Sequence, residues 1–358
     1  MRKLILLPVL AALFALLLGL AMKDTPITGV SEEGVSALVE GLLRRCQVIG
    51  LEDGEQPSVP PLPCLEGGIG VVVEQQGVEP VVDEMLAWYE RDPMKLVHCH
   101  TMMHMLGSYL EPTAGKTYPF ADRWEVCGSG LIHGAFETLA IEGMSPKEAG
   151  AVAIQACAAQ QFASEDALLR DCAHSVGHSV HAVWGDRISE GETACTGAAV
   201  EGYSVASSTL LSQCMGGLYM DEAKRLLAEA GGTVPDTRED WEHRFDHCRS
   251  AADVFECVTS FSRYAASSPA SATSFFQWCD DLAPADSCLH RIARDLGTKT
   301  ALSGDRVFFD TCLSIATGSG TGDAPCTDGL LAASGIAGQT GDRSKICAIL
   351  QERGSACR

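Results

Sequence analysis

The sequence predicts an all-α protein in which helix pairs stack into a disulfide-stapled solenoid, and three observations support this. Sixteen cysteines recur so that one ends an apolar helical stretch and the next opens the following stretch after a short polar loop. From Cys127 to Cys326, the cysteines that open these stretches recur roughly every 31 to 45 residues, which is the range of helix-pair solenoids. The alternation of β-branched and polar residues that is typical of strands is almost absent.

The individual helical units carry recognisable start and stop signals. The stretch CGSGLIHGAFETLAIEG predicts a helix ended by Gly143. The next stretch, SPKEAGAVAIQAC, has Ser145 as N-cap, Pro146 at the first helical position and Glu148 at the third. The same scheme returns in CLHRIARDLGTKTALSG followed by DRVFFDTC, with the break at Gly304, and in CTDGLLAASGIAGQTG followed by DRSKICAIL.

The cysteines are expected to pair with their neighbours along the chain. Their number is even, and no C-x-x-C motif occurs, so a zinc ribbon or a thioredoxin-type site lacks its basic unit. In an oxidising compartment such a set forms a disulfide framework. The pairing among the first four cysteines stays open, because spacing alone does not decide it. The expected pairs are Cys46–Cys64, Cys99–Cys127, Cys157–Cys172, Cys195–Cys214, Cys248–Cys257, Cys279–Cys288, Cys312–Cys326 and Cys347–Cys357.

The N-terminus predicts export. Arg2 and Lys3 precede an uncharged apolar run over residues 4–22, the pattern of a secretory signal, and Gly19 and Ala21 suit cleavage after Ala21. The run is also long enough to cross a bilayer. We therefore expect residues 1–22 to be either a signal peptide or an N-terminal membrane anchor. In both cases the remainder is periplasmic or extracellular.

The net charge of the chain excludes some classes of binding partner. Acidic residues outnumber basic residues 47 to 26, which gives a formal net charge of −21. Such a surface repels phosphate backbones and anionic lipid headgroups, so no nucleic acid is expected, and membrane contact is expected only through the N-terminal segment. Cations and basic partners are favoured.

Three stretches resemble a known repeat family. CGSGLIHG…AIQAC, CAHSVGHS…TAC and CMGGLYMD…HC each open a helix with cysteine and small residues and close an Ala-rich or polar helix with cysteine. They are similar to cysteine-rich Sel1-like repeats and span about a third of the chain. The resemblance implies helix pairs that are each stapled by one disulfide into a curved solenoid. It also implies protein or cell-envelope partners, but no activity.

Histidines are concentrated in one part of the chain. Seven of the ten fall between residues 98 and 181, on three successive predicted helices. Residues three or four apart share a helix face, so each helix presents one stripe of imidazoles, and parallel stacking of the helices brings the stripes together. Imidazole is a common ligand of zinc, copper and iron. The predicted metal site comprises His100, His104, His133, Glu137, His174, His178 and His181.

Neighbouring residues bear on this prediction. Gly134 and Ser179 are expected to leave room for an ion or a substrate. Methionines near the same helices are candidate soft ligands for copper, although methionines at helical spacing are more often core residues; they are Met102, Met103, Met105 and Met220. The alternative for each histidine is a core residue that hydrogen bonds to loop carbonyls. His98 points away from the stripe, His243 and His247 belong to a solvated acidic face, and His290 is a surface residue.

The chain is thus divided into helical repeats over residues 23–91, His-rich repeats with the metal site over 92–247, and plainer disulfide-linked repeats over 248–358. Three functions remain open. The first is binding of a transition metal outside the cytoplasm. The second is a metal-dependent enzyme, an oxidoreductase or hydrolase, in which Glu137 is a bridging ligand or general base. The third is a metal-free scaffold for protein interactions.

Overall fold

The computed structural model of the chain describes residues 34–46, 62–91, 99–110, 126–137, 139, 141, 143–160, 166–199, 202–340 and 343–352. Throughout these residues the regular structure is helical and no strand occurs, so the all-α prediction is confirmed there. The helices are α2 (Val35–Arg45), α3 (Leu62–Gln76), α4 (Val78–Arg91), α5 (Cys99–Gly107), α6 (Val126–Glu137), α7 (Pro146–Ala158), α8 (Asp166–Trp184), α9 (Ile188–Ala198), α10 (Ser207–Glu229), α11 (Arg238–Phe245), η3 (Asp246–Ser250), α12 (Val254–Thr259), α13 (Ser262–Ala265), α14 (Pro269–Asp280), α15 (Ala285–Ser303), α16 (Val307–Ser319), α17 (Ala324–Thr340) and α18 (Arg343–Glu352).

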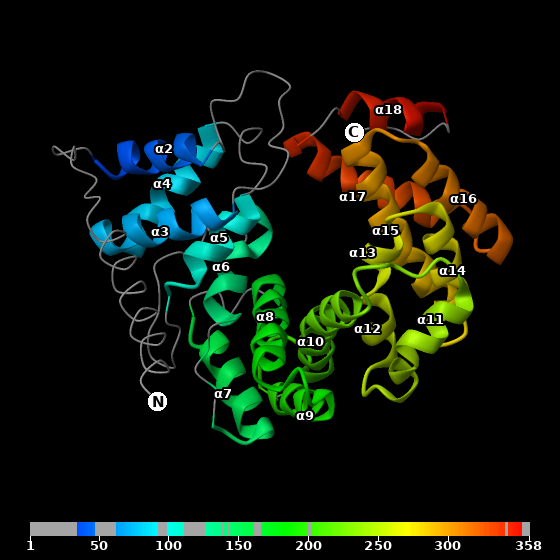
Figure 1. Cartoon of the computed structure of the whole chain (residues 1–358), viewed down its shortest axis with the longest axis horizontal. Coiled ribbons are helices and arrows are strands. Elements are labelled where there is room, and N and C mark those ends of the chain that lie inside the picture. Colours follow the sequence, from blue (N-terminus) through cyan, green and yellow to red (C-terminus); the bar gives the residue numbers. More distant parts are fainter. Residues whose placement is uncertain are drawn as a thin grey trace, which may run out of the picture.

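The helices follow one another along a curved arc. Figure 1 shows α2 to α4 at one end, α8 to α10 in the middle and α14 to α18 at the other end. Helices separated by one intervening helix pack together, as α6 does with α8, α8 with α10, and α15 with α17. This arrangement places alternate helices side by side, which determines where their side chains meet.

Helices α6 and α8 run in the same direction. Near their starts the Ser129 hydroxyl donates to the Asp171 carboxylate, and two turns later the Ser179 hydroxyl donates to the carbonyl of Phe136. Residue numbers therefore increase together along the interface. Parallel helices keep their faces in register, so a stripe of side chains on one helix continues onto the next.

Six of the expected disulfides are present and confirm the neighbour pairing. Each of them joins one helix, or the residue that directly follows it, to the next helix along the chain. They are Cys46–Cys64, Cys157–Cys172, Cys195–Cys214, Cys248–Cys257, Cys279–Cys288 and Cys312–Cys326. Cys127 and Cys347 are also disulfide-bonded. Their expected partners, Cys99 and Cys357, have side chains outside the described set.

The predicted helix boundaries are largely correct. Ser145 is the N-cap of α7 with Pro146 after it, although the Ser145 hydroxyl lies 3.5 Å from the Glu148 carboxylate and makes no cap bond to the backbone. Gly304 ends α15 with a positive φ angle of 68°, which glycine adopts without a steric cost. The helix expected to run to Gly143 instead ends at Glu137, and Gly143, with a φ angle of 78°, lies in the turn before α7. Asp92 and Pro93, a residue pair typical of a helix start, lie outside the described residues.

Aromatic packing fills the middle of the C-terminal half. Five fully buried rings from α11, the η3–α13 region and α14 contact one another, with centroid separations between 4.2 and 6.3 Å. They belong to Trp241, Phe245, Phe261, Phe275 and Trp278. The predicted boundary between residues 247 and 248 falls within η3, directly beside this cluster.

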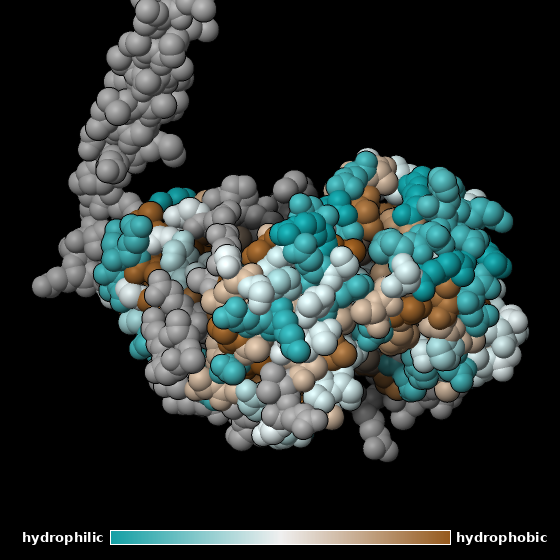
Figure 2. Space-filling view, turned by 90° about the horizontal axis from the view of Figure 1, so that it is seen from below, coloured by the Kyte–Doolittle hydropathy of each residue, from teal (hydrophilic) through white to brown (hydrophobic). Residues whose placement is uncertain are grey.

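The surface is largely hydrophilic. Figure 2 shows hydrophilic residues over much of one face, with hydrophobic residues in small groups between them. In the part of the chain that the structure describes, no helix is both long and apolar enough to cross a membrane. The apolar run over residues 4–22 lies outside that part.

Candidate metal centre

Five of the predicted histidines converge on one face of three parallel helices. We call this set, His100, His104, His133, His174 and His178, the histidine cluster. Neighbouring ring centroids lie 5.2 Å apart for His100 and His133, 5.6 Å for His133 and His174, and 4.9 Å for His174 and His178. His133 also lies 6.3 Å from His104 and 6.1 Å from His178. The ring of His133, on the middle helix α6, is therefore the centre of the cluster.

Glycines bring the three helices close enough for these contacts. A Cβ atom added to Gly134 would lie 1.8 Å from the carbonyl oxygen of His104, and one added to Gly130 would lie 2.4 Å from that of His100. The backbones of α5 and α6 therefore touch at one glycine on each side of His133. Because a larger residue cannot occupy either position, these glycines determine how close the imidazoles come.

Glycines also bring the backbones of α8 and α10 into direct contact. A Cβ atom on Gly217 would lie 2.0 Å from the carbonyl oxygen of His174, and one on Gly177 would lie 2.1 Å from that of Cys214. α10 consequently presents its own polar side chains to the stripe on α8. The sequence pattern of small residues at these helix starts indicated a repeat, and its structural role is direct backbone contact.

Hydrogen bonds from the imidazoles to protein oxygens orient the outer rings. His100 Nδ1 lies 2.9 Å from the carbonyl oxygen of Cys127, and His178 Nδ1 lies 2.8 Å from the carboxylate of Asp221. In each case the protein oxygen accepts a proton from Nδ1, which leaves Nε2 with its lone pair. His174 likewise donates to the backbone of Gln213. Such outer partners fix the tautomer and the orientation of imidazoles that ligate metals.

Glu137 belongs to this outer set. Its carboxylate lies 2.9 Å from His104 Nε2, so it contacts an imidazole of the cluster. It comes from the last residue of α6, one turn after His133. In this position Glu137 orients His104, whereas the sequence had suggested a bridging ligand or a general base.

His133 differs from the other four rings, because it has no hydrogen-bond partner among the described residues. Burial, followed by the proximity of His174, His100, His178 and His104, lowers its pKa from 6.5 to about 2. Burial and His178 lower the pKa of His174 to about 3. Both rings are therefore neutral at physiological pH, which is the form that ligates metals.

His181 is separated from the histidine cluster. Its Nε2 lies 3.2 Å from the Glu222 carboxylate, which also accepts two hydrogen bonds from Arg225 at 2.8 and 2.6 Å. Burial alone raises the pKa of Glu222, but His181 and Arg225 outweigh it and lower the pKa to about 2. The predicted stripe on α8 is thus divided. Two of its histidines enter the cluster and the third anchors a buried carboxylate.

Sequence reasoning missed the carboxylates of α10. Asp221 and Glu222 contact His178 and His181, and hydrogen bonding to His178 lowers the pKa of Asp221 although burial opposes this. The signal was available. Gly216 and Gly217 follow Cys214 as Gly130 follows Cys127, and this predicts close approach of α10 to the preceding histidine-bearing helix.

Several secondary predictions about the site were wrong. Gly134 and Ser179 provide no room for an ion. The backbone of α5 fills the space beside Gly134, and the Ser179 hydroxyl donates to the carbonyl of Phe136 in α6. Met102 and Met103, by contrast, are fully buried in the hydrophobic core, the role that the sequence favoured for them over metal ligation. His247 does not belong to a solvated face, because burial lowers its pKa and it contacts a disulfide.

Within the described part of the chain, one group of three potential ligand residues brings its ligand atoms within 4.8 Å of one another, and it comprises His247, Cys248 and Cys257. The two sulfurs form a disulfide, so they are not thiolate ligands in this state. In the histidine cluster no three ring nitrogens lie that close together, so side chains would have to rotate before three nitrogens face one point.

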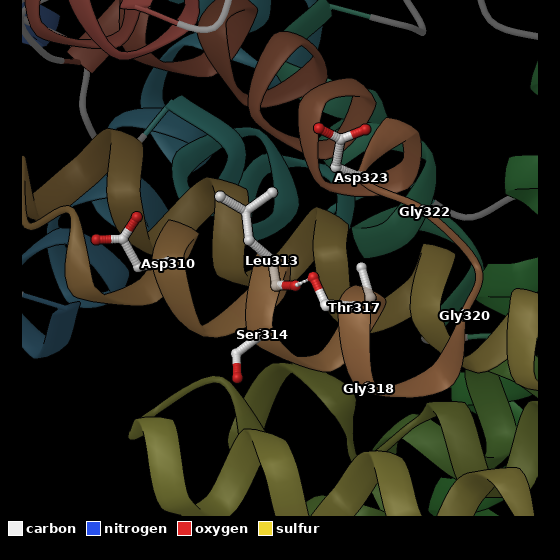
Figure 3. A pocket seen from close by; sticks show the side chains of 9 residues that line it. Asp310, Leu313, Ser314, Thr317, Gly318, Gly320, Gly322 and Asp323 are labelled. Atoms are coloured by element: carbon white, nitrogen blue, oxygen red, sulfur yellow. Dashed lines mark hydrogen bonds between the residues drawn. The ribbon is translucent and has the colours of Figure 1, made fainter.

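Other surface hollows have a different character. The one in Figure 3 lies beside α16 and the turn to α17, where Asp310 and Asp323 flank it and the Thr317 hydroxyl donates to the carbonyl of Leu313. Its lining includes Gly318, Gly320 and Gly322 and no histidine. Its ionisable groups are the two carboxylates alone, and no imidazole or thiol joins them. The histidine cluster is therefore the principal candidate site.

Comparison of the chain with protein-family models, with curated proteins and with solved structures found no match. The resemblance to Sel1-like repeats therefore stays a prediction. The case for a function rests on the geometry of the site.

Proposed function

We propose that the protein binds a transition metal ion, zinc, copper or iron, through the histidine cluster. The observation that carries this proposal is His133, a half-buried and neutral imidazole without a hydrogen-bond partner among the described residues, in ring contact with four other imidazoles. A neutral imidazole whose nitrogens are not held by other protein groups keeps a lone pair available for an ion.

The ring spacing suits a shared ion. An imidazole nitrogen bonds zinc at about 2.0–2.1 Å, which puts two rings on one tetrahedral ion with their centroids about 5 Å apart. The separations of His100, His133, His174 and His178 along the cluster, 4.9 to 5.6 Å, are close to this value. His133 with His174 and His178 forms the most compact group of three and is our preferred ligand set.

The chemistry of the donors also supports a metal. His100 and His178 hold one ring nitrogen on an oxygen acceptor and keep the other available, as ligand histidines do. The donors are imidazoles with carboxylates behind them, and such a set suits Zn²⁺, Cu²⁺ or Fe²⁺ better than Cu⁺. When bound, the ion would supply Lewis acidity, while Asp221 and Glu137 would hold the ligand rings in place.

We further propose that this binding takes place outside the cytoplasm. Six described disulfides are compatible with export, because disulfides persist in oxidising compartments. A disulfide-stapled solenoid gives the cluster a rigid support, since each helix pair is fixed to the next turn. Binding for storage or transfer needs no further group. Enzymatic use would require an open coordination position, and the exposed side of His100 is where a substrate would enter.

Metal uptake by His133→Ala tests the proposal. Untagged protein with its disulfides intact is stripped with a chelator and titrated calorimetrically with Zn²⁺ and with Cu²⁺. Loss of the central ligand should weaken binding on the order of a hundredfold or more, because even outer-shell changes cost 10- to 100-fold. His290→Ala, an exposed histidine on α15, is the matched control and should bind as the native protein does.

Circular dichroism of both variants ensures that a folded protein is compared. If the native protein takes up no ion, or if His133→Ala binds as tightly as His290→Ala, the proposal is wrong and the metal-free scaffold remains.

A further inference from the structure

A second group of potential ligands lies away from the histidine cluster, at the junction of η3 and α12. His247 Nε2 lies 3.6 Å from Cys257 Sγ and 3.8 Å from Cys248 Sγ. Both cysteines are fully buried and form a disulfide, and His247 is half-buried beside it. One ring nitrogen therefore faces both sulfurs of a disulfide.

We propose that reduction of the Cys248–Cys257 disulfide converts this group into a binding site for a thiophilic divalent cation such as Zn²⁺ or Cd²⁺. The ligands would be the two thiolates and His247 Nε2. Two thiolates and a neutral imidazole balance the charge of the ion, which suits a buried position. A fourth position would be filled by water, as in zinc sites with three protein ligands.

The chemistry balances with a dithiol as the reductant. The dithiol transfers two electrons and two protons to the disulfide, becomes a cyclic disulfide itself, and leaves two cysteine thiols. Binding of the cation then releases the two thiol protons to solvent. Oxidation reverses both steps and expels the ion, so the site is gated by the redox state of this cysteine pair.

The surroundings hold the three ligands in place without the S–S bond. His247 and Cys248 are neighbours in η3, and Cys257 lies in α12, whose N-cap Asp253 accepts from the backbone N–H of Glu256. The Glu192 carboxylate accepts from Ala252 N at 3.1 Å and from the Tyr219 hydroxyl at 2.5 Å. The loop between the cysteines is thus attached to α9, independently of the disulfide.

The chain offers a matched control. Cys279–Cys288 has the same sequence separation of 9, and both of its cysteines are also fully buried. In the described part of the chain, no histidine joins these two cysteines in a group of three ligands. The two pairs thus differ in the presence of a third ligand.

The test uses the full chain, treated with a dithiol under native conditions with and without Cd²⁺. Thiolate ligation of Cd²⁺ gives an ultraviolet charge-transfer band that imidazole ligation does not, so the readout is separate from the histidine cluster. Thiols are then alkylated and quantified by peptide mass spectrometry. We expect Cd²⁺ to slow alkylation of Cys248 and Cys257 on the order of tenfold, with little effect on Cys279 and Cys288.

His247→Ala, compared after its oxidised form is shown to melt as the native protein does, should lose this protection and the charge-transfer band. Equal protection of the two cysteine pairs would overturn the proposal. So would unchanged protection in His247→Ala, or a Cys248–Cys257 bond that stays closed while Cys279–Cys288 opens. The oxidised protein binds through the histidine cluster alone, so the two proposals fail separately.

Discussion

At the scale of single residues, folding lowers the pKa of two histidines of the cluster and so disfavours their protonation. His133 and His174 are packed among other imidazoles, and their pKa values fall to about 2 and about 3. In an unfolded chain the pKa of histidine is about 6.5. The folded protein therefore keeps both rings neutral over a pH range in which the unfolded chain takes up protons.

This difference predicts that acid destabilises the metal-free protein. Above about pH 6.5 neither state is protonated at His133 and His174, and their effect on stability is absent. As the pH falls below that value the unfolded state binds more protons, so the free energy of unfolding falls by about 1.4 kcal/mol per pH unit for each histidine. Urea denaturation in the presence of chelator, from about pH 7.5 to about pH 5, measures the slope.

The variant His133→Asn separates this effect from general acid denaturation. It removes one of the two rings that take up a proton on unfolding. The slope of the free energy of unfolding against pH should therefore decrease by the equivalent of about one proton. His290→Asn, at an exposed position, should keep the native slope. Identical slopes in the two variants would show that His133 titrates normally in the folded protein.

At the scale of helices, glycine contacts decide the geometry of the site. Gly130 and Gly134 join α5 to α6, and Gly177 and Gly217 join α8 to α10, each against a backbone carbonyl of the neighbour. Because these helices are parallel, one close contact in each turn keeps the histidine faces in register. The spacing of the imidazoles is therefore a property of the helix interfaces.

Gly134→Ala tests this dependence. The new methyl group would lie 1.8 Å from the carbonyl oxygen of His104, so α5 and α6 must separate. We expect a loss of about 1–3 kcal/mol in the free energy of unfolding, together with weaker metal binding. Gly41→Ala, inside α2 with nothing within 4 Å of the added atom, should instead stabilise the protein by about 0.5–1 kcal/mol. Unaltered stability and metal binding in Gly134→Ala would contradict this role of the glycine.

Most of the helices and the histidine stripes on them were predictable from sequence. Periodic stretches with Ser145–Pro146 at one start and Gly304 at one end indicated the helices, and the histidine stripes followed from spacings of three and four. The sequence did not show that these helices stack in parallel, and it is the parallel stacking that brings the stripes together. The division of the stripe at His181 depended on Glu222 of α10, a contact across 41 residues that the spacing of the histidines does not reveal.

At the scale of the whole molecule, the six described disulfides fix one helix to the next at six points along the arc. Their pairing was predictable because each pair closes a short loop, and the six described bonds have sequence separations of 9 to 19. The curvature of the arc was implied only by the resemblance to repeat proteins. Metal identity depends on the final orientation of a few rings, which neither repeat spacing nor composition specifies.

Removal of one bond should have a local effect. Cys157→Ala/Cys172→Ala deletes the link between α7 and α8, and closure of a loop of this length is worth about 3 kcal/mol. In a chain of stacked repeats the lost stability stays near the change. Hydrogen exchange should therefore accelerate in α7 and α8 and remain slow in α15 to α17. Uniform acceleration along the whole chain would show that the protein unfolds as one unit instead.

The most direct test of the proposed metal centre is X-ray absorption spectroscopy at the metal edge of the oxidised protein loaded with one equivalent of Zn²⁺. We predict a first shell of nitrogen at about 2.0–2.1 Å, with the outer-shell scattering of two or three imidazole rings and no sulfur. A first shell of oxygen without imidazole scattering, or a protein that retains no zinc, would contradict the central claim that the histidine cluster is a metal site.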